Sequence, residues 1–290
     1  MTIRVAVVTG GNKGIGLEIV RVLCRQLGDG GMVYLTARNE SRGQQAVELL
    51  GKEGLAPKFH ILDVMDTGTI SRFRDYIKKT HGGLDILVNN AGIGTPPDLS
   101  SYDQAQTVLA TNFTGLLEVS QSLIPLLRSG GRVVHLASTT AHMAFLQLGD
   151  KVKAKFRQVS SEQDVIDLMS DFLKVQKAGT IAQEGWMEWS YGISKLGVVS
   201  LAMMQAQEIS KDSSRQDILI NSCCPGFVHT DMTAHLSDDF YGGKKVSIVE
   251  GADTPVYLAT LPAGSTEPHG KFLLRRQVYD FINSDMEIQI

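Results

Sequence analysis

The chain has 290 residues, a formal net charge of −3 and 43% apolar residues, which is enough material for a substantial hydrophobic core. This charge gives no general attraction for nucleic acid or for an anionic membrane surface, so neither is expected as a partner. The three cysteines form no disulfide framework, which is typical of a reducing compartment and favours a cytoplasmic location. The seven histidines are scattered without ligand spacing, so no metal site is expected.

Short runs rich in β-branched residues alternate with segments of helical periodicity along the whole chain. The expected strands are 3–8, 32–37, 59–62, 84–89, 132–137, 218–223 and 272–274. The expected helices are 16–27, 41–52, 67–79, 107–128, 191–210 and 247–259. This alternation predicts an α/β fold: a single doubly wound (Rossmann) domain, 1–290, with a parallel seven-stranded sheet and helices on both faces. The run 3–8 leads straight into a glycine loop, so it is read as a strand and not as a signal peptide.

The glycine loop is the first motif with a chemical meaning. It reads Thr9-Gly10-Gly11-Asn12-Lys13-Gly14-Ile15-Gly16, between an expected strand and an expected helix. Unpaired backbone N–H groups and a helix N-terminus would meet there, which makes a site for a pyrophosphate that the glycines allow to approach closely. Glycine loops also serve as plain turns, so the motif is weak by itself.

A second motif, Tyr191-Gly-Ile-Ser-Lys195, places a phenol and an ammonium on one helical face, where both can reach the same reacting atom. Such spacing is common on ordinary helix surfaces. Here it is accompanied by Asn89-Asn90-Ala91-Gly92 after the fourth expected strand, by Asn112, and by Ser138 at the end of the fifth.

Taken together and in this order, the motifs resemble the short-chain dehydrogenase/reductase family, over nearly the whole chain. The family's catalytic tetrad is matched by Asn112, Ser138, Tyr191 and Lys195. The stretch 139–189 is longer than the family usually has, and this insertion resembles that of the monomeric carbonyl reductases. The runs Lys155-Phe-Arg, Glu184-Gly-Trp186 and Cys223-Cys-Pro-Gly226 make the likeness to that subfamily close.

Within the insertion, Ser161-Glu-Gln-Asp164 has the form of a capping box. Apolar residues then recur at helical spacing up to Gly179: Val165, Leu168, Met169, Phe172 and Leu173. This predicts one added helix packed on the domain surface, with a partner-binding face as the less favoured alternative for its apolar stripe. Because the helix would cover the face by which shorter relatives associate, a monomer is expected.

The identity of the dinucleotide depends on the residue that follows the second strand, where a carboxylate favours NAD and a cation favours NADP. Here Arg38 occupies that place, and Lys13 and Arg42 are two further cations near it, so NADPH is the expected cofactor. The alternative makes Arg38 a solvated loop charge and Glu40 the ribose ligand.

The resemblance implies further cofactor contacts. Asp63 and Val64 would flank the adenine, although Asp63 is also a plausible helix cap. Asn90, Ala91 and Gly92 would support the ribose, although a tight turn would look the same. The full expected cofactor set is Gly10, Asn12, Lys13, Gly14, Ile15, Gly16, Arg38, Arg42, Asp63, Val64, Asn90, Ala91, Gly92, Tyr191, Lys195, Pro225, Gly226, Val228 and Thr230.

Reduction of a carbonyl needs a hydride on carbon and a proton on oxygen, and a nicotinamide supplies only the hydride. Tyr191 is the expected general acid in reduction and the general base in the reverse direction. Bringing a tyrosine phenol from its reference pKa of about 10 toward neutrality takes about 4 kcal/mol. One ammonium about 4 Å away supplies roughly that much at an effective dielectric of about 20, and Lys195 is its expected source.

Ser138 is expected to hydrogen-bond the substrate oxygen, although a serine after a strand is also a common turn residue. By resemblance, Asn112 distorts its helix and holds a water that links Lys195 to solvent; otherwise it is a polar core residue satisfied by backbone. Beside Ser138 and Tyr191, the expected substrate residues are Ile93, Trp189, Phe227 and Met232, with Thr139 and Thr140 as further candidates for the pocket.

The resemblance implies quinones, aromatic aldehydes and ketones as substrates. Phe227 stands where a tryptophan is more familiar, and Cys224 is open to two interpretations, a pocket residue near a glutathione-linked site or a buried structural thiol. Two alternative functions stay open: a hydroxysteroid or prostaglandin dehydrogenase, and a non-catalytic NADP(H)-sensing binding protein.

Overall fold

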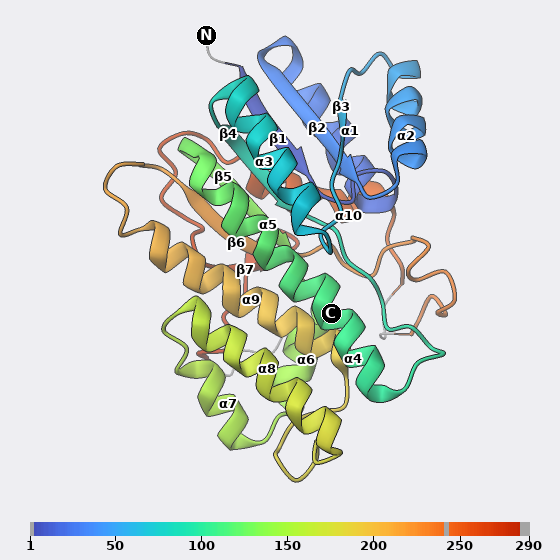
Figure 1. Ribbon diagram of the computed structural model, residues 1–290, viewed down its shortest axis with the longest axis vertical. Coiled ribbons are helices and arrows are strands. Elements are labelled where there is room, and N and C mark those ends of the chain that lie inside the picture. Colours follow the sequence, from blue (N-terminus) through green and yellow to red (C-terminus); the bar gives the residue numbers. More distant parts are fainter. Residues whose placement is uncertain (1–2, 241–243, 285–290) are drawn as a thin grey trace.

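The computed structural model describes residues 3–240 and 244–284. Its centre is one twisted sheet, whose strands follow the order β3-β2-β1-β4-β5-β6-β7-β8 (Figure 1). The strands are β1 (Arg4–Val8), β2 (Gly31–Ala37), β3 (Lys58–Ile61), β4 (Leu84–Asn89), β5 (Leu127–Leu136), β6 (Leu219–Cys224), β7 (Phe272–Leu274) and β8 (Gln277–Val278). The first seven are parallel, as expected; β8 is an additional short strand that pairs antiparallel with β7.

Helices cover both faces of this sheet (Figure 1). One face carries α1 (Gly14–Leu27), α2 (Glu40–Lys52) and α10 (Ile248–Ala259), and the other carries α3 (Thr67–His81), α4 (Ser101–Leu109), α5 (Gly115–Leu123) and α9 (Ser190–Ile209). Along β1, Ala6 and Val8 enter the core cluster under the first group, whereas Val5 and Val7 enter a cluster under the second. Both faces of the strand are therefore buried, which explains its continuous apolar sequence.

The strand order reverses at β1, which lies between β2 and β4. In a doubly wound sheet, ligands bind at the carboxyl ends of the strands next to such a reversal. The glycine loop follows β1, Asn90 follows β4, and Ser138 follows β5, so the topology gathers these three segments at one edge.

The long helix expected at 107–128 is wrong in its detail. The chain forms α4, then a π-helical turn (Ala110–Thr114), then α5, a 3₁₀ turn (Ile124–Leu126), and β5 begins at Leu127. Pro125 lies at the start of the 3₁₀ turn, where its missing N–H ends the α-helical ladder. The widened turn contains Asn112, and π-turns inside helices often mark functional positions.

The insertion forms three helices where one was expected: α6 (Thr140–Gln147), α7 (Asp150–Arg157) and α8 (Glu162–Ala178). The first two have only eight residues each, too short for a clear period in the sequence. The expected helix is α8. Its Ser161 hydroxyl accepts from the Asp164 N–H at 3.2 Å, as expected for an N-cap, and the Asp164 carboxylate accepts from the Ser160 N–H at 2.8 Å.

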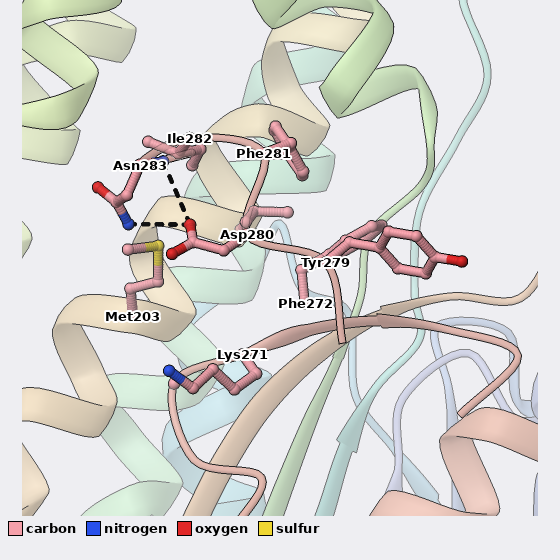
Figure 2. Close-up of a pocket in the computed structure, with 10 residues that line it drawn as sticks. Met203, Lys271, Phe272, Tyr279, Asp280, Phe281, Ile282 and Asn283 are labelled. Carbon is pink, nitrogen blue, oxygen red and sulfur yellow. Dashed lines mark hydrogen bonds between the residues drawn. The ribbon is translucent and has the colours of Figure 1, made fainter. Parts of the chain in front are cut away.

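The apolar stripe of α8 packs inward, against α9 and α4. Phe172 is fully buried in this cluster, which also contains Phe281 and Ile282 from the C-terminal segment. Figure 2 shows this segment turning over Met203 of α9, with the Asp280 carboxylate accepting from Asn283. The Arg157 side chain donates to the Ile282 carbonyl at 2.8 Å and so ties α7 to the same segment.

Among the described residues, no helix has both the length and the hydropathy to cross a bilayer.

Candidate active site

The glycine loop and the loop after β4 are joined by a dense set of hydrogen bonds. The Asn90 side chain donates to the carbonyls of Thr9 (2.8 Å) and Gly10 (3.1 Å). In return, the Thr9 hydroxyl oxygen accepts from the N–H groups of Asn90 and Ala91, both at 3.0 Å. Asn90 and Ala91, which were expected at the cofactor, therefore stabilise the conformation of the glycine loop that would bind the pyrophosphate.

Three positions of the loop favour glycine, two through a left-handed backbone and one through lack of room. Gly10 has a φ of 63°, a left-handed conformation that strains other residues. A Cβ on Gly16 would lie 2.4 Å from the Asn90 side-chain nitrogen and 2.5 Å from the Gly10 carbonyl oxygen. Gly14 opens α1 with a φ of 55°, beside the side chain of Thr230. The site thus places the N-terminus of α1 next to a loop whose glycines leave space for a ligand, and this arrangement fits a dinucleotide pyrophosphate.

The expected adenine end is rich in exposed charge. Arg38 follows β2 directly, is exposed, and has no hydrogen bond or ion pair within the described part of the chain. Lys13 pairs with Asp231 at 2.7 Å, with 61% and 79% of the two side chains exposed, so its ammonium is shared with a carboxylate. This hydrogen bond lowers the pKa of Asp231, and the nearby charge of Arg42 adds to the effect.

The remaining residues of this region have local roles as well. Asp63 is half-buried after β3, and its carboxylate accepts from the Met65 N–H at 3.0 Å. The carbonyl and side chain of the neighbouring Val64 close the space in front of Gly115. Glu40, the alternative ribose ligand, lies exposed in the first turn of α2.

Lys195 is buried on α9, and its ammonium donates to the Leu136 carbonyl at 2.8 Å. The nitrogen lies 5.7 Å from the centroid of the Tyr191 ring, one helical turn earlier. Burial lowers the pKa of Lys195 to about 8, because a charged ammonium is poorly solvated there. Phenol and ammonium thus share one helical face, as their spacing predicts.

Asn112 lies fully buried in the π-helical turn. Its side-chain oxygen accepts from the Ile93 N–H at 2.8 Å, and its nitrogen donates to the Ile93 carbonyl at 3.0 Å and to the Ser194 hydroxyl at 3.3 Å. The side chain therefore fixes the loop after β4 against α9. The water relay to Lys195 stays a prediction.

Ser138 lies two residues before α6 begins, and its side-chain oxygen accepts from the Thr140 N–H at 3.2 Å. Ser138 and Tyr191 both line a cavity of about 660 Å³, together with the expected Trp189, Phe227 and Met232 and with Thr139 and Thr140. Ile93 is not among the lining residues, because Asn112 holds its backbone beside α9; Gly94 and Thr95 stand at the wall instead.

The segment after β6 forms another part of the wall. Pro225, Gly226 and the buried Cys224 line the cavity, and burial raises the pKa of the Cys224 thiol. Val228 forms a bridge with Val246, which brings Thr230 over the glycine loop. These residues lie between the loop and the cavity, where a nicotinamide would enter.

The far wall of the cavity was missed by the sequence analysis. It is formed by His235, Leu236, Phe240, Lys244, Val246, Glu250, Asp253, Thr254, Leu274 and Arg275. Residues 231–247 have no periodicity that would have selected them. For Leu274 and Arg275 a signal did exist: Leu274 ends an expected parallel strand and Arg275 follows it, and the carboxyl ends of all such strands face the same edge.

The site combines three features: a glycine loop held by hydrogen bonds, a buried ammonium beside a phenol, and a hydroxyl that lines the same cavity. Together they define a nicotinamide-dependent oxidoreductase of the doubly wound class. The family model for the short chain dehydrogenases matches residues 4–150, and the chain belongs to the short-chain dehydrogenase/reductase family.

Similar proteins place the chain more narrowly within this family. It is 43% identical over 279 residues to carbonyl reductase [NADPH] 1 of Homo sapiens, covering 95% of this chain and 98% of that protein. It is 44% identical over 273 residues to carbonyl reductase [NADPH] 3 of Mus musculus, covering 93% and 95%. Among solved structures, salutaridine reductase from Papaver somniferum superposes with a TM-score of 0.78 at 30% identity, covering 93% of this chain and 99% of that one.

Proposed function

We propose that the protein is an NADPH-dependent carbonyl reductase that converts quinones, aromatic aldehydes and ketones to alcohols. The observation that carries this proposal is the placement of Ser138 and Tyr191 on one wall of the 660 Å³ cavity, with the Lys195 ammonium buried behind the phenol. The printed names of the relatives that match nearly the full length support the reaction and the cofactor.

The division of labour follows from the reaction. When bound, NADPH supplies a hydride to the carbonyl carbon. Tyr191 donates the proton to the carbonyl oxygen, and the Ser138 hydroxyl donates a hydrogen bond to the same oxygen as negative charge develops there. Lys195 stabilises the phenolate left on Tyr191, and Asn112 keeps the adjoining loop in place through Ile93.

Apolar and aromatic side chains on the cavity wall support flat hydrophobic substrates. Trp189, Phe227 and Leu274 line it from three different segments of the chain, and Met232 and Phe240 stand partly exposed along it. The size of the cavity is in the range that holds a small aromatic molecule.

The decisive experiment measures NADPH oxidation with menadione and with an aromatic aldehyde. The wild type should turn over both, and Tyr191→Phe should lose about 10²–10⁴-fold in turnover while still binding NADPH in a calorimetric titration. Tyr279→Phe, which removes a phenol outside the cavity, is the matched control and should remain active. Binding of NADPH without turnover of any carbonyl would favour a sensor, and turnover restricted to hydroxysteroids or prostaglandins with NADP⁺ would favour a dehydrogenase.

The cofactor preference is proposed to depend on Arg38, because its guanidinium is exposed and unpartnered in the described structure. Arg38→Asp should raise the Michaelis constant for NADPH far more than that for NADH. Equal effects on both would remove Arg38 from phosphate recognition and favour the solvated-charge interpretation.

We also infer that the protein is a monomer and acts in the cytoplasm. The monomer is supported by α8 and by residues 279–284, which together cover α9 on the side away from the sheet. Light scattering that gives a dimer or tetramer at micromolar concentration would refute it. The cytoplasmic location is supported by three free cysteines, and cell fractionation tests it.

A further inference from the structure

The cavity reaches from the catalytic residues to the hairpin between β7 and β8. Leu274 pairs with Gln277, so the turn consists of two residues, Arg275 and Arg276. Their φ angles are 51° and 63°. A two-residue turn with both φ values positive normally uses glycine or asparagine, because a larger side chain is strained there. Two arginines in this turn are therefore unusual in backbone terms.

The two arginines have opposite surroundings. Arg276 is fully engaged: Asp253 accepts from its Nε at 2.8 Å and from its Nη2, and its guanidinium stacks 5.1 Å from the centroid of the Tyr257 ring. Its backbone N–H donates to the Thr254 hydroxyl at 3.2 Å. Arg275 lines the cavity, is exposed, and has no hydrogen bond or ion pair to any residue that the structure describes.

The other charged groups of this wall do not neutralise Arg275. Asp253 is occupied by Arg276. Glu250 accepts from the N–H of Ser247 at 2.9 Å and from its hydroxyl at 2.8 Å, in the capping box of α10. Lys244 adds a second cation without an ion pair in the described ranges, and His235 is a third polar group. Glu250 keeps its negative charge, since its hydrogen-bond donors are neutral, but the three cations Lys244, Arg275 and Arg276 still outnumber the two carboxylates Asp253 and Glu250, so the net charge at this end is positive.

We propose that Arg275 is a specificity-determining residue that binds the carboxylate of carbonyl substrates whose acidic group is separated from the carbonyl by an apolar body. A guanidinium matches a carboxylate with two parallel hydrogen bonds. The apolar body would lie along Leu274, Phe227 and Trp189, with the carbonyl at Ser138 and Tyr191. This inference rests on the proposed function, because it describes the far end of the same substrate.

The test compares free acids with their methyl esters in a series of aryl aldehydes of increasing length: 4-formylbenzoate, 4-formylcinnamate and 4-(4-formylphenyl)butanoate. In the wild type, kcat/KM should favour the acid over its ester for at least one length. Arg275→Gln should reduce that acid-to-ester ratio about tenfold, through KM, and leave the esters and benzaldehyde unchanged. Arg275→Lys should retain part of the preference, and Arg275→Glu should reverse it.

A matched control has the same loss of charge elsewhere: Arg74→Gln, on the exposed surface of α3, should leave the ratio unchanged. An unchanged ratio in Arg275→Gln, or a preference for the ester at every length in the wild type, would overturn the proposal. If the wild type reduced neither benzaldehyde nor menadione, the proposed function would fail by itself. Calorimetric binding of 4-phenylbutanoate to the NADP⁺-loaded wild type and to Arg275→Gln would then still decide whether Arg275 binds the carboxylate.

Discussion

The Lys195 ammonium donates to the Leu136 carbonyl at 2.8 Å and so joins α9 to the end of β5, two residues before Ser138. The same side chain approaches Gly92, where a Cβ would lie 3.7 Å from its nitrogen. Three segments that carry the expected site residues, α9, the end of β5 and the loop after β4, thus meet at one buried cation. The Leu136 carbonyl holds the ammonium on the same helical face as the Tyr191 ring, 5.7 Å from its centroid.

This buried cation makes stability depend on pH in a definite direction. The folded pKa of Lys195, about 8, lies below its ordinary value of 10.5, so between these values the unfolded chain holds a proton that the folded chain has lost. Stability therefore rises with pH across this window, by at most about 1.4 kcal/mol per pH unit. The free energy of unfolding of Lys195→Met, measured with urea at pH 7, 8.5 and 10, should not rise with pH in this way. If the free energies of variant and wild type changed with pH in parallel, the prediction would be contradicted.

His135 on β5 predicts a second pH effect, on the acid side. It is fully buried, its Nδ1 accepts from Asn89 at 3.0 Å, and its Nε2 donates to Gln205 at 2.8 Å. Burial lowers its pKa to about 4, so stability is complete above about pH 6.5 and is lost as pH falls toward 4. His135→Gln should show a shallower loss between pH 7 and 5 in urea unfolding. An equal slope would mean that other groups dominate acid unfolding.

Gly16 predicts a steric effect on cofactor binding. Gly16→Ala would place a methyl group against the Asn90 side chain and the Gly10 carbonyl, both of which hold the phosphate loop. NADPH affinity should fall by about tenfold or more, measured by calorimetry. Gly30→Ala is the matched control, since nothing lies within 4 Å of its added Cβ, and it should bind normally. Normal binding by Gly16→Ala would show that the loop can shift.

The ion pair between Lys13 and Asp231 predicts that removal of the Asp231 charge increases the affinity for NADPH. If Lys13 contacts the extra phosphate of NADPH, the Asp231 carboxylate competes for the same ammonium. Asp231→Asn should then tighten NADPH binding about two- to fivefold at low salt, with little change for NADH, because exposed ion pairs are weak and screened. An equal gain for both cofactors would place Lys13 away from that phosphate.

Much of the fold was predictable because its signals are local. Strands buried on both faces are apolar throughout, and a single β-branched run such as 3–8 is enough to reveal one. The spacing of Tyr191 and Lys195 fixes a shared helical face wherever the helix lies. Within the insertion, only α8 was predicted, because its seventeen residues are long enough to repeat a pattern.

The sequence by itself determined the chain order of the seven parallel strands, the glycine loop and the spacing of the phenol and the ammonium, because each depends on residues close together in the chain. Only the tertiary structure decided that the Asn112 side chain holds the backbone of Ile93, that Ile93 stays off the cavity wall, and that Arg275 stands on it. These features depend on contacts between distant segments, where packing and the satisfaction of buried polar groups override local preference.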